Sequence, residues 1–239
     1  MGATVGNRLD DKRFRELLVE SDDLQSDAMR GARSDLGSYV AAAKDFGVTS
    51  KDIMALQTAA GLENLAVLAY KTALTLDFIG GSSANGVVKA FAMKTMQQHT
   101  EHGQAFNAAV KQLGGKEQTA TDPKYTPVVQ SAVPTIKGPA DVVALAITLE
   151  DIAAQTYVNN VGLVSTADLR QLFASVAGVE SQHKAILLAV QALLKGGAPQ
   201  LIALPPDAAK LPAAAGSVGF PDGFYPISKA APVAEGAVQ

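Results

Sequence analysis

The chain has 239 residues, of which 48% are hydrophobic and 18% charged, a composition typical of a folded globular protein and not of a disordered one. A formal net charge of −3 and the lack of Lys/Arg-rich runs argue against binding to nucleic acid or to an anionic membrane surface. The chain has no cysteine, which excludes disulfides and thiolate ligands, so a bound metal must use histidine, carboxylate, amide or water ligands.

Apolar runs and the N-terminal residues bear on membrane insertion and export. No window approaches the roughly 20 apolar residues of a membrane span, so no span is predicted. Residues Met1 to Asp10 lack the basic and apolar segments of a signal peptide. The sequence as given therefore predicts a cytoplasmic protein, and an exported protein that had already been processed would look the same.

Residues 1–48 are predicted to form a helical extension that precedes the main domain. Apolar residues recur at helical spacing between about residues 10 and 33. A shorter helix is expected over residues 38–46, where Gly47 would end it.

The main domain is predicted over residues 49–197 and contains four long helices bounded by capping and turn residues. Ser50 and Thr166 are suitable N-caps, Pro139 fits the first turn of a helix, and Gly-Gly pairs end three of the helices. The expected helices cover about residues 51–78, 83–113, 139–164 and 166–196.

The lengths of the connections predict the topology. The first two helices are joined by a few residues, as are the last two, so each pair should form an antiparallel hairpin. Residues 116–137, between the hairpins, contain three prolines and show no helical period. Fully extended, this linker spans on the order of 70 Å, whereas a 30-residue helix is only about 45 Å long. We therefore expect an all-α four-helix bundle whose second and third helices run parallel.

After Gly197 the composition shifts to Pro, Ala and Gly, so residues 198–239 are predicted to form a separate tail. Phe220, Phe224 and Tyr225 suggest that the tail docks on the bundle in an extended form. A partly disordered tail is the alternative.

The two predicted hairpins resemble each other in sequence. Glu63 in the first helix is followed seven residues later by Tyr70, and Glu150 in the third helix is followed by Tyr157 at the same spacing. An internal duplication is the economical interpretation. The two tyrosines could line a site near the glutamates, although core packing with a hydrogen-bonded hydroxyl is their more ordinary role.

All three histidines and three of the glutamates lie where a metal site in a bundle core needs them. His99 and His102 are three residues apart and share a helix face, as do Glu180 and His183. Glu63 and Glu150 lie in apolar helical stretches, with no lysine or arginine within a turn on the same face. A buried, unpaired carboxylate is costly, so each needs a proton, a cation or a metal. The predicted metal ligands are Glu63, His99, His102, Glu150, Glu180 and His183.

Two glutamates have neighbours that distinguish a buried position from an exposed one. Glu180 has Lys184 four residues later and could form a surface pair with it, but the rest of its face is apolar and favours burial. Glu101 has polar neighbours and is predicted to face solvent, outside the site.

At these residues the chain resembles the ferritin-like superfamily and, within it, the bacterial ferritin-like domain proteins. The resemblance covers about residues 50–197. The family pattern has one glutamate on each of the first and third helices and a Glu-x-x-His on each of the others. His99 departs from this pattern, because it stands where the family has a glutamate. The matching residues are Glu63, His102, Glu150, Glu180 and His183.

The resemblance implies a ferritin-like bundle with a dinuclear iron site that uses oxygen or peroxide. Because His99 replaces a glutamate, three carboxylates leave one positive charge of two divalent ions to be balanced by water, hydroxide or another anion. Zinc or manganese, a mixed site or a single metal ion then becomes an alternative to the di-iron site. A second hypothesis is a non-catalytic interaction protein with a decayed metal site. The extensions disfavour packing into a hollow storage cage, so a monomer or homodimer is expected.

Overall fold

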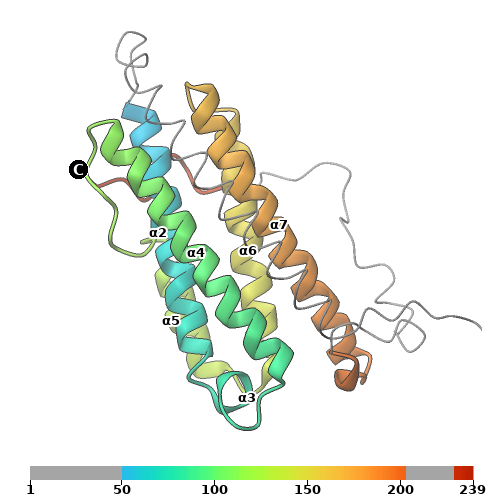
Figure 1. Ribbon diagram of the computed structural model, residues 1–239. Helices are drawn as coiled ribbons and strands as arrows, with labels where there is room; N and C mark the ends of the chain where they lie inside the picture. Colours follow the sequence, from blue (N-terminus) through green and yellow to red (C-terminus); the bar gives the residue numbers. More distant parts are fainter. Residues whose placement is uncertain (1–49, 203–228, 239) are drawn as a thin grey trace, which may run out of the picture.

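The computed structural model describes residues 50–202 and 229–238, and all regular structure in these ranges is helical. The prediction of an all-α bundle is confirmed, while the helices expected over residues 10–33 and 38–46 lie outside the described residues. The long helices are α2 (Ser50–Ala73), α4 (Gly86–Gln112), α6 (Pro139–Val161) and α7 (Ala167–Lys195) (Figure 1). The short ones are α3 (Asp77–Gly80), α5 (Thr126–Ala132), η1 (Val133–Thr135) and η2 (Pro199–Leu201).

The four long helices form two hairpins that pack together. α2 lies along α4, and α6 lies along α7, each pair antiparallel as predicted (Figure 1). The crossover returns the chain along the bundle, so that α4 and α6 run parallel (Figure 1). Contacts between α2 and α6 join the two hairpins.

The first long helix ends at Ala73, earlier than predicted. The hydroxyls of Thr72 and Thr75 donate to backbone carbonyls in the preceding turn, and such bonds compete with the helical ladder. The chain then forms α3, where a Cβ on Gly80 would lie 1.9 Å from the carbonyl oxygen of Leu74. The Gly-Gly stop was therefore placed correctly, but it ends α3 and not the long helix.

Capping residues explain the other helix limits. α4 begins at Gly86, slightly later than predicted, because the Asn85 side chain caps it and accepts hydrogen bonds from the backbone amides of Val87 and Val88. Pro139 occupies the first turn of α6 and Thr166 caps α7, both as predicted. α6 ends at Val161, slightly earlier than expected.

Residues 116–137 show no helical period in the sequence, yet the crossover contains two short helices, α5 and η1. Pro127 lies in the first turn of α5 and Pro134 in the first turn of η1. Proline is tolerated there because the first turn of a helix does not need its missing amide proton. Residues that argued against helix in the sequence therefore begin short helices instead.

Residues 229–238 form a non-helical segment, with a turn at residues 233–236, that lies against α2 and α6 and that we call the C-terminal strap (Figure 1). Its backbone hydrogen-bonds to Gln155 and Thr156 on α6 and to Thr58 on α2. Ala231 is 1% exposed and joins the main apolar core. This part of the predicted tail thus packs on the bundle. The expected anchors Phe220, Phe224 and Tyr225 lie outside the described residues.

Among the described residues one helix, α2, is long and apolar enough to cross a membrane, so the prediction that no window approaches such a span was wrong. Length and composition alone are weak evidence, because the core helix of a bundle passes the same test. The apolar window of α2 is 67% buried inside the bundle. Asp52 and Glu63, both on α2, are also buried there.

Two apolar clusters fill the bundle on either side of a polar layer. In one of them the rings of Phe106, Tyr157 and Phe173 pack with centroids between 5.0 and 6.0 Å apart. The other lies toward the opposite end of the helices and includes Ile79 and Leu187. Water is therefore excluded from above and below the layer between them.

Candidate metal centre

Six titratable side chains from the four long helices meet in the polar layer. α2 and α6 each contribute one glutamate, α4 contributes two histidines, and α7 contributes a glutamate and a histidine. None is more than 4% exposed. These six are the ligands predicted from the sequence, Glu63, His99, His102, Glu150, Glu180 and His183.

The structure places Glu180 inside the cluster and Glu101 outside it, as predicted. Glu180 is fully buried, and the Lys184 ammonium pairs with Asp151 at 2.6 Å instead of forming the surface pair with Glu180. Glu101 lies outside the cluster, as predicted, but it is half-buried instead of facing solvent, and it accepts a hydrogen bond from Gln97.

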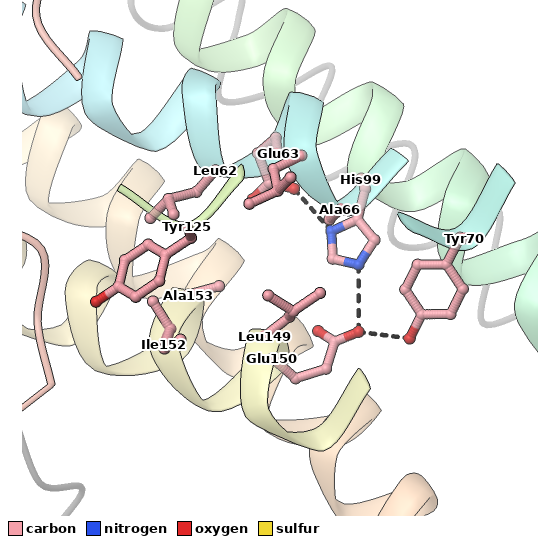
Figure 2. A pocket seen from close by; sticks show the side chains of 11 residues that line it. Leu62, Glu63, Ala66, Tyr70, His99, Tyr125, Leu149, Glu150, Ile152 and Ala153 are labelled. Atoms are coloured by element: carbon pink, nitrogen blue, oxygen red, sulfur yellow. Dashed lines mark hydrogen bonds and ion pairs between the residues drawn. The ribbon is translucent and has the colours of Figure 1, made fainter. Parts of the chain in front are cut away.

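His99 lies at the middle of the cluster. Its Nδ1 is 2.7 Å from Oε2 of Glu63, and its Nε2 is 3.3 Å from Oε1 of Glu150 (Figure 2). The two ring nitrogens therefore face glutamates on two different helices, α2 and α6.

Two sets of four side chains have ligand atoms that all lie within 4.8 Å of one another. One set contains Glu63 and His102, and the other contains Glu150 and His183. His99 and Glu180 belong to both sets. The cluster therefore resembles a dinuclear metal site with two shared residues.

Several polar atoms of the cluster are buried without a hydrogen-bond partner in the described part of the chain. They are both ring nitrogens of His102 and both carboxylate oxygens of Glu180. His102 Nδ1 does lie 2.9 Å from Glu180 Oε1, but the two groups are not aligned for a hydrogen bond. Buried polar atoms are rarely left unpaired, and metal ions bound to His102 Nδ1 and to the two Glu180 oxygens would satisfy three of these four. The donor set therefore fits a metal.

The family model of the ferritin-like domain matches residues 51–193, which is more than half of the chain. The chain belongs to the ferritin-like domain family. The match extends from the first turn of α2 to the last turn of α7 and includes all six cluster residues, but not the C-terminal strap. The resemblance inferred from the sequence is confirmed. No curated protein and no solved structure matches the chain.

Two tyrosines support the glutamates of this ferritin-like domain from opposite helices. The Tyr70 hydroxyl on α2 donates to Glu150 on α6 at 2.6 Å. The Tyr157 hydroxyl on α6 donates to Glu63 on α2, also at 2.6 Å. The repeated Glu/Tyr motif thus produces a reciprocal pair of hydrogen bonds. The rings of both tyrosines pack in the apolar clusters, while their hydroxyls hydrogen-bond to glutamates of the site. Each tyrosine therefore has both of its predicted roles.

Gln98 was missed in the sequence analysis. Its Oε1 lies 2.7 Å from Nε2 of His183. When Nε2 donates its proton there, Nδ1 of His183 faces Glu150 with a free lone pair. The sequence signal is weak, because Gln98 is one of the polar neighbours of Glu101, on a face predicted to be solvent-exposed.

The pKa values reflect mutual attraction between the buried glutamates and histidines. Burial raises the pKa of Glu63, but the neighbouring His102 and His99 outweigh it and lower this pKa to about 2. Burial lowers the pKa of His102, but Glu63 and Glu180 outweigh it and raise this pKa to about 9. Burial itself raises the pKa of Glu180. A metal ion that binds here must therefore displace protons from imidazoles.

A pocket between α2 and α6 reaches the cluster of this ferritin-like domain. It is lined mainly by apolar side chains, with Glu63, His99 and Glu150 at one end (Figure 2). Tyr125, from the crossover, lies across the other side (Figure 2). Its hydroxyl points away from the cluster and donates to the carbonyl of Lys229 in the strap, 3.4 Å away.

Proposed function

We propose that this ferritin-like domain binds two divalent transition-metal ions in the Glu/His cluster, with iron as the first candidate and zinc or manganese as alternatives. The observation that carries the proposal is the convergence of three carboxylates and three imidazoles in a buried layer. Nitrogen and oxygen donors of this kind suit all three metals.

Burial supports this proposal energetically. Three carboxylates buried close together repel one another, and each needs a compensating positive charge. The lysine nearest to the cluster in sequence, Lys184, is engaged by Asp151. Metal ions would neutralise the carboxylates and would also bind the orphaned Nδ1 of His102 and the orphaned oxygens of Glu180.

Iron bound at such a centre supplies oxidation by oxygen or peroxide. The side chains around the cluster hold the ligands and exclude water. The hydroxyl of Tyr70 holds Glu150 in place, and that of Tyr157 holds Glu63. Gln98 orients the ring of His183. The apolar pocket between α2 and α6 borders the ligands and has a cavity volume of about 20 Å³, room for a molecule about the size of water.

Metal content and thermal unfolding test the proposal. Protein purified without chelator should contain a substantial fraction of an equivalent of transition metal by mass spectrometry. Anaerobic Fe(II), Mn(II) or Zn(II) at about 100 times its Kd should stabilise the wild type by about 2.7 kcal/mol. The double variant Glu63→Gln, Glu150→Gln should lose this stabilisation. Glu101→Gln, outside the cluster, should keep it.

The same experiment separates metal binding from the alternative of a non-catalytic bundle with a decayed site, which the replacement of a family glutamate by His99 favours. A decayed site predicts that the double variant is at least as stable as the wild type, with or without metal. Metal-free wild type that gains no stability from any of the three ions would reject the proposed function.

A further inference from the structure

The surroundings of His99 differ from those of a histidine that binds a single metal ion. Such a histidine points one nitrogen at the ion and donates from the other to a protein group or water. His183 has this arrangement, with Nδ1 toward the glutamates and Nε2 toward Gln98. Both nitrogens of His99, in contrast, face carboxylates of the cluster.

Glu180 divides its two oxygens in the same way. Its Oε1 lies 2.9 Å from Nδ1 of His102, and its Oε2 lies 3.4 Å from Nδ1 of His183. His99 and Glu180 each direct one atom to one half of the cluster and their other atom to the other half.

The atoms of the first half have the spacing of ligands around one ion. Ligand atoms at about 2.0–2.1 Å from a tetrahedral metal lie about 3.3 Å from one another. His99 Nδ1 is 2.7 Å from Glu63 Oε2 and 3.6 Å from Glu180 Oε1. His102 Nδ1 is 3.7 Å and 2.9 Å from the same two oxygens. Two nitrogens and two oxygens thus form one donor set.

The second half repeats this pattern. Glu150 Oε1 is 3.3 Å from His99 Nε2, and Glu150 Oε2 is 3.3 Å from His183 Nδ1. With Glu180 Oε2 this set has two nitrogens and three oxygens, two of which belong to the one carboxylate of Glu150. The two sets meet at the imidazole ring of His99 and the carboxylate of Glu180.

We propose that His99 is a bridging ligand, an imidazolate whose Nδ1 binds one metal ion and whose Nε2 binds the other. This inference rests on the proposed function and adds the role of the residue that departs from the family pattern. A neutral imidazole carries one N–H, so binding of the second ion releases that proton to water. Glu180 bridges the same two ions through its two oxygens.

The charge of the cluster agrees with a bridge of this kind. Three carboxylates and one imidazolate carry four negative charges, which equals the charge of two divalent cations. A neutral His99 would leave one positive charge in a layer where uncompensated charge is costly. The histidine can therefore take over the negative charge and the bridging position of the family glutamate, without an added anion.

The bridge predicts an unusually large separation between the ions. Two metal–nitrogen bonds of about 2 Å on either side of one imidazole ring place the ions about 6 Å apart. Two-metal sites bridged by small ligands have ions about 3.5–4 Å apart. The separation of the ions therefore distinguishes the two arrangements.

A crystal structure of the full-length protein loaded with Zn(II) tests this inference through anomalous scattering, independently of any activity. We expect two zinc peaks about 6 Å apart with the ring of His99 between them. The bridge would be rejected if the two peaks lie less than about 4 Å apart, or if one ring nitrogen of His99 binds no ion. Either result would leave the proposed function intact. A single peak, or none, would reject both the bridge and the dinuclear site.

The variant His99→Glu is a matched control, because it restores the family residue at this position. It should also bind two zinc ions, but with the peaks closer together, at about 3.5–4 Å. If wild type and His99→Glu give the same separation, the imidazole does not set the distance, and the bridge is rejected.

Discussion

At the scale of single residues, the reciprocal tyrosine bonds are the clearest supports of the candidate ligands. Tyr70→Phe and Tyr157→Phe each remove one hydroxyl that donates to a buried glutamate, and leave the ring in place. Loss of such a supporting bond should weaken metal binding roughly 10- to 100-fold, measured by competition with a chromophoric chelator. Tyr125→Phe is the control, because its hydroxyl bonds to the strap and should leave metal affinity unchanged.

Glu180 offers a second prediction at this scale, because its two oxygens face the two halves of the cluster. Glu180→Gln should therefore weaken the binding of both metal ions, whereas Glu63→Gln should weaken mainly one. Glutamine preserves the volume of the side chain, and burial already disfavours the charged form of Glu180, so the variant should fold. Metal stoichiometry in titrations distinguishes the two variants. If Glu180→Gln and Glu63→Gln lose the same number of bound metal ions, Glu180 is not shared between the two ions.

The site residues themselves could be predicted from the sequence because they break apolar stripes. Glu63 and Glu150 stand out on helix faces that are otherwise aliphatic apart from one tyrosine each, and no basic residue lies within a turn on either face. The pairing of atoms could not be predicted, because it depends on the axial register of four helices. Nothing in the sequence shows that Tyr70 reaches Glu150 rather than the glutamate on its own helix.

At the scale of elements, caps and Gly-Gly pairs marked the helices well, but the irregular segments were less predictable. Prolines in the crossover have the same appearance whether they prevent a helix or begin one, and Pro127 begins α5. The strap has no periodic signal, because side chains of the helices hold its backbone. Its partners Gln57, Thr58, Gln155 and Thr156 are buried polar residues whose role becomes clear only in the fold.

The strap leads to a prediction at the scale of elements. Ala231 is buried in the core, whereas Ala234, in the same segment, is exposed. Ala231→Asp should destabilise the protein by more than about 2 kcal/mol, because it buries a charge without a partner. Ala234→Asp should change stability by less than about 0.5 kcal/mol. Chemical denaturation measures both. An equal, small effect would mean that the strap does not contribute to the stability of the domain.

At the scale of the whole molecule, the charged layer couples folding to protonation. Two apolar clusters enclose the layer, so its glutamates and histidines must neutralise one another or be neutralised by metal. The same attraction that organises the ligands therefore stabilises the metal-free fold over a limited range of pH.

For the metal-free protein, stability should be greatest in weakly acidic solution. The pKa of His102 rises from 6.5 to about 9 on folding, so its stabilisation is complete below pH 6.5 and is lost as pH rises through 9. The pKa of Glu63 falls from 4.5 to about 2, so its stabilisation is complete above pH 4.5 and is lost as pH falls through 2.

Between pH 6.5 and 9 the free energy of unfolding of the metal-free protein should therefore fall by on the order of 3 kcal/mol. Urea unfolding in chelator measures this change, and His102→Gln should reduce it. Bound metal should oppose the alkaline loss, because it competes with protons for the imidazoles. Constant stability of the metal-free protein across this interval would show that His102 gains no proton affinity on folding.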